Sequence, residues 1–207
     1  MRRLTALLVL VLSFVLSPTI AQASAPTEEV TQDDVVEIVS SDDPEAAFAA
    51  LPSAEQEEVR TMVAEAVAPS TESGRTVALT PSAAQELGLK PPKTKAATLT
   101  AVVAGGCWSH YYYTNWTLYG ASIANSWMTL NWCGSKGSIT SYSISNVGGS
   151  GSGLSYQGNT KSTRNVGWEV RGVTTHSWSF WIGGISKCMQ VRGGATGLYS
   201  RSVSCSM

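Results

Sequence analysis

Aspartate is absent from the chain after Asp43, and from Lys90 onward the only acidic residue is Glu169. Glycoside hydrolysis by paired carboxylates needs two acids, and calcium sites of the EF-hand type need several, so the C-terminal half holds neither. It also lacks a G-x-S-x-G nucleophile elbow and a phosphate-binding G-x-x-x-x-G-K-S/T loop. These absences exclude the commonest hydrolase and nucleotide-binding sites from this half of the chain.

The sequence also has no CxxC pair and only two histidines, so we expect neither a metal site nor a cofactor. Its four cysteines all lie in the C-terminal half, where an even number favours two disulfides in an exported protein. Four cysteines allow three pairings. The pairs Cys107–Cys133 and Cys188–Cys205 close the shortest loops, and each would contribute about 3 kcal/mol by restricting the unfolded chain.

The first residues predict a cleavable signal peptide. Arg2 and Arg3 precede an apolar stretch over residues 4–20, and Ala21-Gln22-Ala23 offers small residues at the positions that a signal peptidase reads. The apolar stretch is too short and too interrupted for a typical membrane-spanning helix, and no other apolar run approaches its length. We therefore expect residues 1–23 to be removed and the remaining chain to be secreted and extracellular, with no membrane span.

Charge divides the remaining chain in two. Residues 24–89 hold fourteen acids and only two basic residues, whereas residues 90–207 hold ten Lys and Arg against Glu169. Such asymmetry favours an anionic partner for the basic half, and it suggests that the acidic half pairs with the basic half and masks it. The predicted domains are an acidic helical pro-segment with its linker over residues 24–95, and a basic, disulfide-linked β domain over residues 96–207.

Start signals predict short helices in the acidic segment. Thr31 is placed to cap one helix, Asp43-Pro44 opens a second, and Thr80-Pro81 opens a last one. The best helix begins at Ser53-Ala54-Glu55-Gln56, which fits a capping box, and apolar residues then recur at helical spacing. Helices this short are marginal alone in water, so they need a partner surface, which we expect the β domain to supply.

Two segments of turn-forming composition predict linkers, at residues 69–75 and 88–95. The second reads GLKPPKTK and holds three lysines, so we expect it to be extended and open to a basic-specific protease near Lys95. One interpretation is a propeptide that is removed at this point. The other is a solvated acidic extension that stays attached.

Short runs of strand-forming residues between glycine-rich turns follow residue 96 and predict an antiparallel β-sandwich or small barrel, of which we favour the sandwich. A run over residues 125–133 is apolar on both faces, which is typical of a central strand. In 166–175 the even-numbered residues, Trp168 included, form the core face, so Glu169 and Arg171 are neighbours on the solvent side. Strands are expected at 108–114, 116–123, 125–133, 138–146, 153–158, 166–175, 178–182, 186–192 and 197–205.

The densest feature is an aromatic run that reads WSHYYYTNW. Aromatic rings with polar tips stack on sugar rings, on bases or on anchor residues of a partner, so this run is the main candidate binding site. Alternation separates Trp108 and Tyr112 from Tyr111 and Tyr113, and one of these sets must lie outside a single core. The alternative is that the rings only pack a core short of aliphatic residues. The predicted binding residues are Trp108, Tyr111, Tyr112, Tyr113, Trp116 and Arg171.

One catalytic arrangement survives the exclusions. Glu169, Arg171, His176 and His110 are the residue types of a metal-free ribonuclease, in which carboxylate and imidazole transfer protons and the guanidinium binds phosphate. However, His176 has the parity of the core face unless a β-bulge intervenes. The alternative to catalysis is a surface ion pair and two ordinary histidines.

The function that these observations favour is binding. We predict a secreted, cationic, aromatic-rich protein, made as a precursor, that engages an extracellular anionic polymer, glycan or cell-surface ligand, and a defensive or antimicrobial role would fit such a surface. One alternative is a small ribonuclease-like toxin that uses Glu169, Arg171 and a histidine. Another is an inhibitor of an extracellular protease that presents a disulfide-anchored loop.

The mass of the protein recovered from the culture medium tests this organisation. We expect a chain that begins at Ser24 or, if the acidic segment is removed, near residue 96, and that lacks the hydrogens of all four thiols. A secreted chain that begins at Met1, or cysteines that react with an alkylating reagent without prior reduction, would contradict the prediction.

Overall fold

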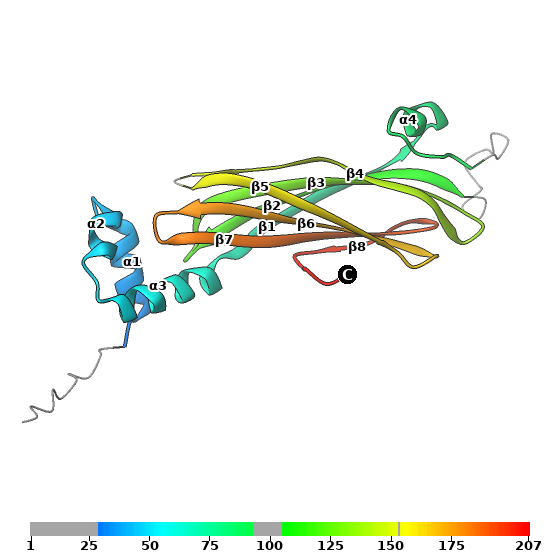
Figure 1. Ribbon diagram of the computed structural model, residues 1–207. Coiled ribbons are helices and arrows are strands. Elements are labelled where there is room, and N and C mark those ends of the chain that lie inside the picture. The colour runs from blue at the N-terminus through cyan, green and yellow to red at the C-terminus, as the bar shows by residue number, and fades with distance from the viewer. Residues whose placement is uncertain (1–28, 93–104, 153) are drawn as a thin grey trace, which may run out of the picture.

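Two four-stranded antiparallel sheets pack face to face in the computed structural model, which describes residues 29–92, 105–152 and 154–207 (Figure 1). The β-sandwich expected from the sequence is therefore confirmed. The predicted signal peptide and the linker lysines Lys93 and Lys95 lie outside the described residues. Within the described ranges, no helix is both long and apolar enough to cross a membrane.

Both sheets are meanders, because their strands pair in chain order. Sheet A consists of β1 (Ala68–Leu79), β2 (Gly106–Leu118), β3 (Ala121–Ser135) and β4 (Ser138–Gly151). Sheet B consists of β5 (Ser155–Asn165), β6 (Glu169–Phe180), β7 (Gly183–Gly194) and β8 (Gly197–Ser202). The turns Tyr119-Gly120 and Lys136-Gly137 have positive φ at both residues, as the type I′ turns of two-residue hairpins require.

Several strands run further than the sequence pattern predicts. The expected glycine loop over residues 148–153 is wrong in its first half, because β4 continues beside β3 as far as Gly151. The expected break between residues 175 and 178 is also wrong, since β6 is one strand with a regular ladder to β7. Trp168 was expected in the core but is 51% exposed, because it lies in the turn before β6 begins.

The helices of the acidic segment are α1 (Gln32–Ser40), α2 (Pro44–Ala49), α3 (Ser53–Ala66) and α4 (Pro81–Glu86). Thr31, Asp43 and Thr80 cap α1, α2 and α4 as predicted, each accepting a hydrogen bond from a main-chain N–H of the first turn. The capping box predicted at Ser53 is wrong. Pro52 occupies the cap position of α3 without a side-chain hydrogen bond, and Gln56 donates instead to the Leu51 carbonyl at 2.9 Å.

Residues 69–75 belong to β1 and are not a linker. β1 pairs antiparallel with β2 from Ala68 opposite Thr117 to Leu79 opposite Cys107, so the acidic segment supplies the edge strand of sheet A. The sequence pattern misses this strand because its side chains from Ala68 to Ala78 are all exposed, and no apolar face marks it. A boundary at residue 95 therefore falls between two paired strands of one sheet.

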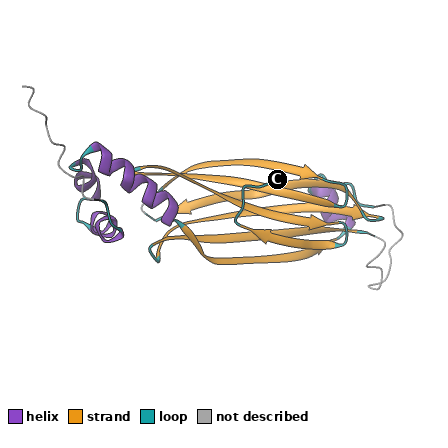
Figure 2. Ribbon diagram, turned by 90° about the horizontal axis from the view of Figure 1, so that it is seen from below, coloured by secondary structure: helices purple, strands orange, loops and turns teal. Residues whose placement is uncertain are grey.

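Helices α1 to α3 form a lobe at one end of the sandwich, here called the helical lobe, while α4 lies at the other end (Figure 2). The lobe packs against the turn between β6 and β7, where the rings of Phe48 and Trp181 lie 5.3 Å apart. Arg60 donates from Nε to the Ile182 carbonyl at 2.8 Å, and Lys187 donates from Nζ to the Ala64 carbonyl at 2.9 Å. The lobe is thus held by apolar contacts and hydrogen bonds to main-chain carbonyls.

The core lies between the two sheets and is closed at both ends by tryptophan. Trp132 of sheet A donates from Nε1 to the Gly194 carbonyl of sheet B at 2.9 Å. Trp178 of sheet B donates from Nε1 to the Ser150 carbonyl of sheet A at 3.1 Å. Between them pack the even-numbered side chains of β3, which is a central strand of sheet A as predicted.

Both predicted disulfides are present, and both lie on outer faces of the sandwich. Cys107–Cys133 joins β2 to β3, and Ala84 and Leu89 from the region of α4 cover it. Cys188–Cys205 fixes the C-terminal segment to β7. These cross-links fit an extracellular protein, in which disulfides persist.

A small residue opposite Trp132 is required by the packing. A Cβ atom on Gly193 would lie 2.6 Å from the indole ring, which is fully buried and held by its bond to Gly194. We expect Gly193→Ala to lower the free energy of unfolding by about 1–3 kcal/mol in urea denaturation. Gly184→Ala on the same strand is the matched control, since the atom nearest to its added Cβ is the Trp178 carbonyl oxygen at 3.9 Å, and it should change stability by less than about 0.5 kcal/mol. Equal losses in the two variants would contradict this account.

Candidate functional site

The alternation of β2 divides its aromatic run between core and surface. Tyr112 and Trp116 point between the sheets and are 0% and 2% exposed, and Trp108 points the same way and stacks on Trp132 at 5.9 Å. Tyr111 and Tyr113 occupy the outer face. Among the binding residues predicted on β2, only Tyr111 and Tyr113 are therefore placed to contact a ligand on the outer face. Trp108, Tyr112 and Trp116 belong to the core.

Trp127 extends this outer aromatic set onto the next strand. It lies directly opposite Tyr113 in the pairing of β2 with β3, so both rings share the outer face of sheet A. Its indole lies across Gly148 of β4, where a Cβ atom would be only 2.6 Å from the ring. We call Tyr111, Tyr113 and Trp127 the aromatic strip. The sequence pattern did not identify Trp127 as a binding residue. The turn Tyr119-Gly120 alone would have paired Tyr113 with Ser126, and a register shift between Trp116 and Thr117 brings Trp127 opposite Tyr113 instead.

Neutral hydrogen-bonding groups surround the aromatic strip. Thr129 lies opposite Tyr111, and Asn131 follows on the same face and donates from Nδ2 to the Ser145 hydroxyl at 2.8 Å. Asn125, on the other side of Trp127, accepts from the Ser150 hydroxyl at 2.9 Å. Burial, and then the neighbouring Tyr113, raise the pKa of Tyr111, so its hydroxyl stays neutral and can both donate and accept.

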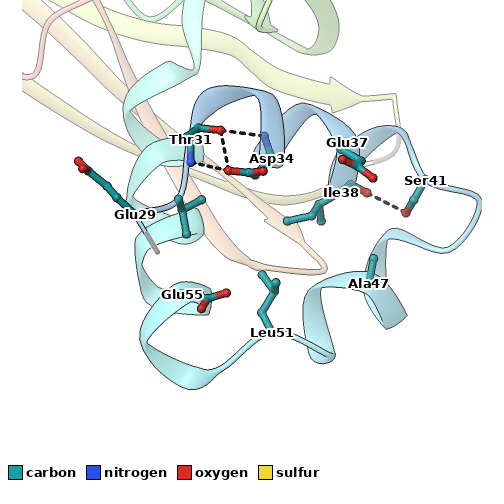
Figure 3. A pocket seen from close by; sticks show the side chains of 10 residues that line it. Glu29, Thr31, Asp34, Glu37, Ile38, Ser41, Ala47, Leu51 and Glu55 are labelled. Carbon is teal, nitrogen blue, oxygen red and sulfur yellow. Dashed lines mark hydrogen bonds between the residues drawn. The ribbon is translucent and has the colours of Figure 1, made fainter. Parts of the chain in front are cut away.

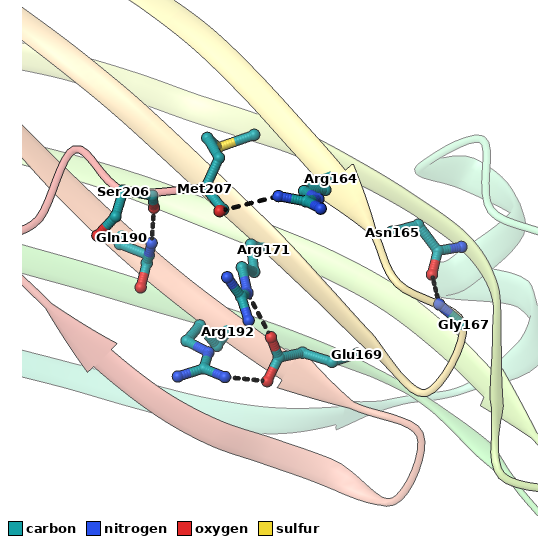
Figure 4. A network of polar contacts seen from close by, with 9 residues as sticks. All are labelled: Arg164, Asn165, Gly167, Glu169, Arg171, Gln190, Arg192, Ser206 and Met207. Atoms are coloured by element: carbon teal, nitrogen blue, oxygen red, sulfur yellow. Dashed lines mark hydrogen bonds and ion pairs between the residues drawn. The ribbon is translucent and has the colours of Figure 1, made fainter.

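Three arginines form a row across the outer face of sheet B. Arg164, Arg171 and Arg192 lie opposite one another on β5, β6 and β7, and we call them the arginine row. The carboxylate of Glu169 accepts from Arg171 Nε and from Arg192 Nη2, each at 2.6 Å (Figure 4). Arg164 donates to the Met207 carbonyl at 3.2 Å. The predicted neighbours Glu169 and Arg171 are thus in contact, within a larger network.

Glu169 lies on the outer face of sheet B, as the sequence pattern predicts, but it is not exposed to solvent. Its side chain is fully buried although it points outward, because the two guanidinium groups cover it. Burial alone would raise the pKa of this carboxyl, but hydrogen bonds and charges from Arg192 and Arg171 outweigh it, and the pKa lies below its ordinary value. Glu169 is therefore held as a carboxylate with both oxygens occupied, a poor state for a proton-transfer group.

The histidines lie elsewhere. His176 is on the core face of β6, as its parity predicts, where it stacks on Trp178 and bonds to the hydroxyls of Tyr156 and Thr174. His110 faces the core from β2 in the other sheet, and its Nδ1 lies 2.8 Å from the Thr76 hydroxyl. The structure brings neither imidazole to the outer face where Glu169 and Arg171 meet. The ribonuclease arrangement is therefore not assembled.

Cys107–Cys133 links two residues that already face each other in paired strands, and Cys188–Cys205 pins the terminal segment. Within the part of the chain that the structure describes, no group of three or more His, Cys, Asp and Glu is placed to hold a metal ion.

A cavity of about 520 Å³ lies in the helical lobe, between α1, α2 and α3 (Figure 3). Val30, Ile38 and Leu51 supply apolar walls. Four carboxylates stand around it, from Glu29, Asp34, Glu37 and Glu55, and that of Asp34 accepts from the Thr31 main chain at 2.7 Å. The cavity is acidic and belongs to the segment that the sequence marks as a pro-segment.

Fold and site together define a two-disulfide antiparallel β-sandwich with an aromatic strip on one outer face and an arginine row on the other. Comparisons with protein-family models, with curated proteins and with solved structures gave no significant match.

The buried histidines predict acid sensitivity. Burial lowers the pKa of His176 to about 4, and burial followed by the charge of Arg201 lowers that of His110 to about 4, whereas histidine in an unfolded chain titrates near 6.5. Between these values the unfolded chain binds protons that the folded chain refuses, so the free energy of unfolding falls as pH drops from about 6.5 toward 4.

We expect each histidine to contribute up to about 1.4 kcal/mol per pH unit within that window. His176→Gln should flatten the pH dependence of the urea midpoint between pH 6.5 and 4, whatever its effect on stability at pH 7. An unchanged slope would mean that His176 is already protonated in the folded protein.

Proposed function

We propose that this protein is an extracellular glycan-binding β-sandwich, and that the aromatic strip of sheet A is its binding face. The observation that carries the proposal is the joint placement of Tyr111, Tyr113 and Trp127 on one uncovered outer face. Tyr111 is 38% exposed there, although the β2 residues on either side of it are buried in the core.

The chemistry of the strip suits a sugar chain. Aromatic faces pack against the apolar faces of sugar rings, and rings set on paired strands offer a rigid platform that loses little conformational entropy on binding. The amide of Asn125 and the hydroxyl of Ser145, both half-buried on the same face, supply donors and acceptors for sugar hydroxyls. Arg75 of β1, opposite Tyr111, is the nearest cation in the pairing. A strip with so little charge favours a neutral glycan.

An anionic polymer is the second candidate, and the arginine row supports it. Three guanidinium groups in line across three strands match a chain of anionic groups. However, Glu169 and the C-terminal segment already accept hydrogen bonds from this row, so a ligand would have to compete with them. The row lies on the outer face of sheet B, and one ligand therefore cannot touch both surfaces. The single cationic aromatic surface expected from the sequence resolves into two.

The precursor organisation is part of the proposal. We infer export by the signal peptide and removal of the acidic segment near Lys95, with the two disulfides as the supporting observation for an oxidising compartment. The acidic segment then acts before release, as a part of the fold that the mature binding protein lacks.

Pull-down on insoluble polysaccharides tests the binding face. With microcrystalline cellulose, chitin and purified peptidoglycan as probes, we expect retention on at least one, and about a tenfold loss of affinity for Tyr113→Ala and for Trp127→Ala. Tyr142→Ala is the matched control, since Tyr142 is also 38% exposed but belongs to the opposite face of sheet A at β4.

Salt separates the two candidates. Stacking on a neutral glycan should change little between 50 mM and 500 mM salt, whereas binding through the arginine row should fall steeply and should weaken in Arg164→Ala. Retention that is lost in Arg164→Ala but unchanged in Trp127→Ala would overturn the glycan proposal in favour of the polyanion.

A further inference from the structure

β1 is bound to the sandwich through main-chain pairing and polar side-chain contacts, and not through an apolar face. Eleven of its twelve residues are exposed, although Arg201 of β8 reaches over Gly74, where an added Cβ atom would lie 2.9 Å from the guanidinium Nη1. Side-chain hydrogen bonds join β1 to β2 at four residue pairs. Tyr112 donates from its hydroxyl to Glu72 at 2.7 Å, and the Thr76 hydroxyl lies 2.8 Å from His110 Nδ1. Asn115 donates from Nδ2 to the Ser70 hydroxyl at 3.0 Å, and the Thr117 hydroxyl donates to the Ala68 carbonyl at 3.3 Å. Removal of β1 would therefore expose little apolar surface.

β2 does not depend on β1 for its position. Tyr112, Trp116 and Leu118 are buried against sheet B, and the ladder to β3 continues along the whole strand. The disulfide Cys107–Cys133 and the two-residue turn to β3 hold its ends. If β1 left, β2 would stay in place with one row of main-chain N–H and C=O groups uncovered.

β1 and β2 differ in whether their composition suits an exposed sheet edge. β1 carries Pro69, Glu72, Gly74 and Arg75, which are the residue types that keep an edge strand from pairing with another chain. β2 has thirteen residues and not one Lys, Arg, Asp or Glu. β1 thus has the composition of a protective edge, and β2 has that of a strand that must be covered.

The other edge strands of the described structure are guarded. β5 carries Lys161 and Arg164, and β8 carries Arg201. β4 is uncharged, but its ladder to β3 shifts register near Asn146, which has a positive φ. Among these strands, β2 alone would offer a long uncharged edge with a regular ladder, which runs from Gly106 to Trp116 before the register shifts, and only after β1 has gone.

We infer that β1 is a removable cap, and that the β2 edge which it covers pairs with β2 of a second copy once the acidic segment has been removed. Antiparallel pairing of two identical edges is self-complementary about a two-fold axis, so one strand supplies both halves of the interface. No like charges would face each other across it, because β2 has none. This inference takes the removal of the acidic segment from the proposed function and adds what the removal does.

Such a dimer would also enlarge the binding face. A two-fold axis perpendicular to the joined sheets keeps both outer faces on the same side, so Tyr111 and Tyr113 of the two copies would stand side by side. Two aromatic strips on one platform would engage a polymer at two points, which raises the apparent affinity without any new contact.

The pairing geometry identifies which residues of β1 hold it in place. Cys107 and Cys133 lie with their Cα atoms 4.0 Å apart, the spacing of a pair that shares no main-chain hydrogen bonds, so the main-chain groups of Cys107 point toward β1. Alternation along the regular ladder then directs Ser73 toward β2 and Ala78 toward solvent. Proline at Ser73 should break the cap, and proline at Ala78 should be tolerated.

The test uses the full chain with the recognition sequence of a site-specific protease inserted after Lys95. After cleavage in vitro, the segment should dissociate at lower urea from Ser73→Pro than from the parent or from Ala78→Pro. Sedimentation velocity should then show the remaining β domain at twice its monomer mass, with native tryptophan fluorescence. Asn115→Lys, which places a charge on the uncovered edge, should return it to a monomer.

A second experiment uses a variant in which β1 is joined covalently to β2. Thr71 and Asn115 are opposite each other, so Thr71→Cys with Asn115→Cys should join β1 to β2 by a disulfide and keep the cleaved protein monomeric. A β domain that loses the segment, keeps native fluorescence and stays monomeric at every concentration would overturn the inference. Loss of native fluorescence on release would overturn it too, because β2 would then need β1. Neither readout involves a glycan or cellular processing, so failure here is distinct from failure of the proposed function.

Discussion

Two indole N–H groups fix how the sheets of this sandwich face each other. Trp132 bonds from sheet A to the Gly194 carbonyl and Trp178 bonds from sheet B to the Ser150 carbonyl, so each sheet anchors one ring in the other. A buried indole N–H without an acceptor would cost about 1–3 kcal/mol, so a slip of one sheet along the other is penalised at both ends. Strand geometry directs the side chains of β2, β3 and β6 alternately toward the core and the outer face, and the fixed alignment determines which side chains of the two sheets meet in the core.

Alternation also explains what could be predicted from the sequence. Where a strand has one face in the core, as in β6, parity placed Val170 and His176 correctly, and short loops gave the right cysteine pairs. Trp168 escaped because a turn interrupts the parity one residue before the strand. The sequence pattern missed β1 because this strand is stabilised by main-chain pairing with β2 and not by an apolar face of its own. Pairing between segments separated by a long connection leaves no signal in the local sequence.

The candidate site was predicted in the same partial way. The aromatic run of β2 could be located from the sequence. Whether Tyr112 or Tyr113 faces a ligand depends on which face of sheet A the second sheet covers, and the sequence does not give this. Trp127 and the Glu169 clamp depend on pairing between strands, which places residues far apart in sequence side by side. The separation of aromatic and basic residues onto opposite faces is likewise a property of the sandwich, since the composition alone mixes them in one domain.

The acidic segment is held at three points, by the helical lobe on the turn between β6 and β7, by β1, and by Leu89 over a disulfide. While the chain is intact, the tether presents β1 to its neighbour at an effective concentration of order millimolar. A cut in the linker would leave all three contacts in place but make rebinding bimolecular. Dilution outside the cell, and not the cut itself, would then set the moment of release, so that processing could finish well before the binding protein changes its state.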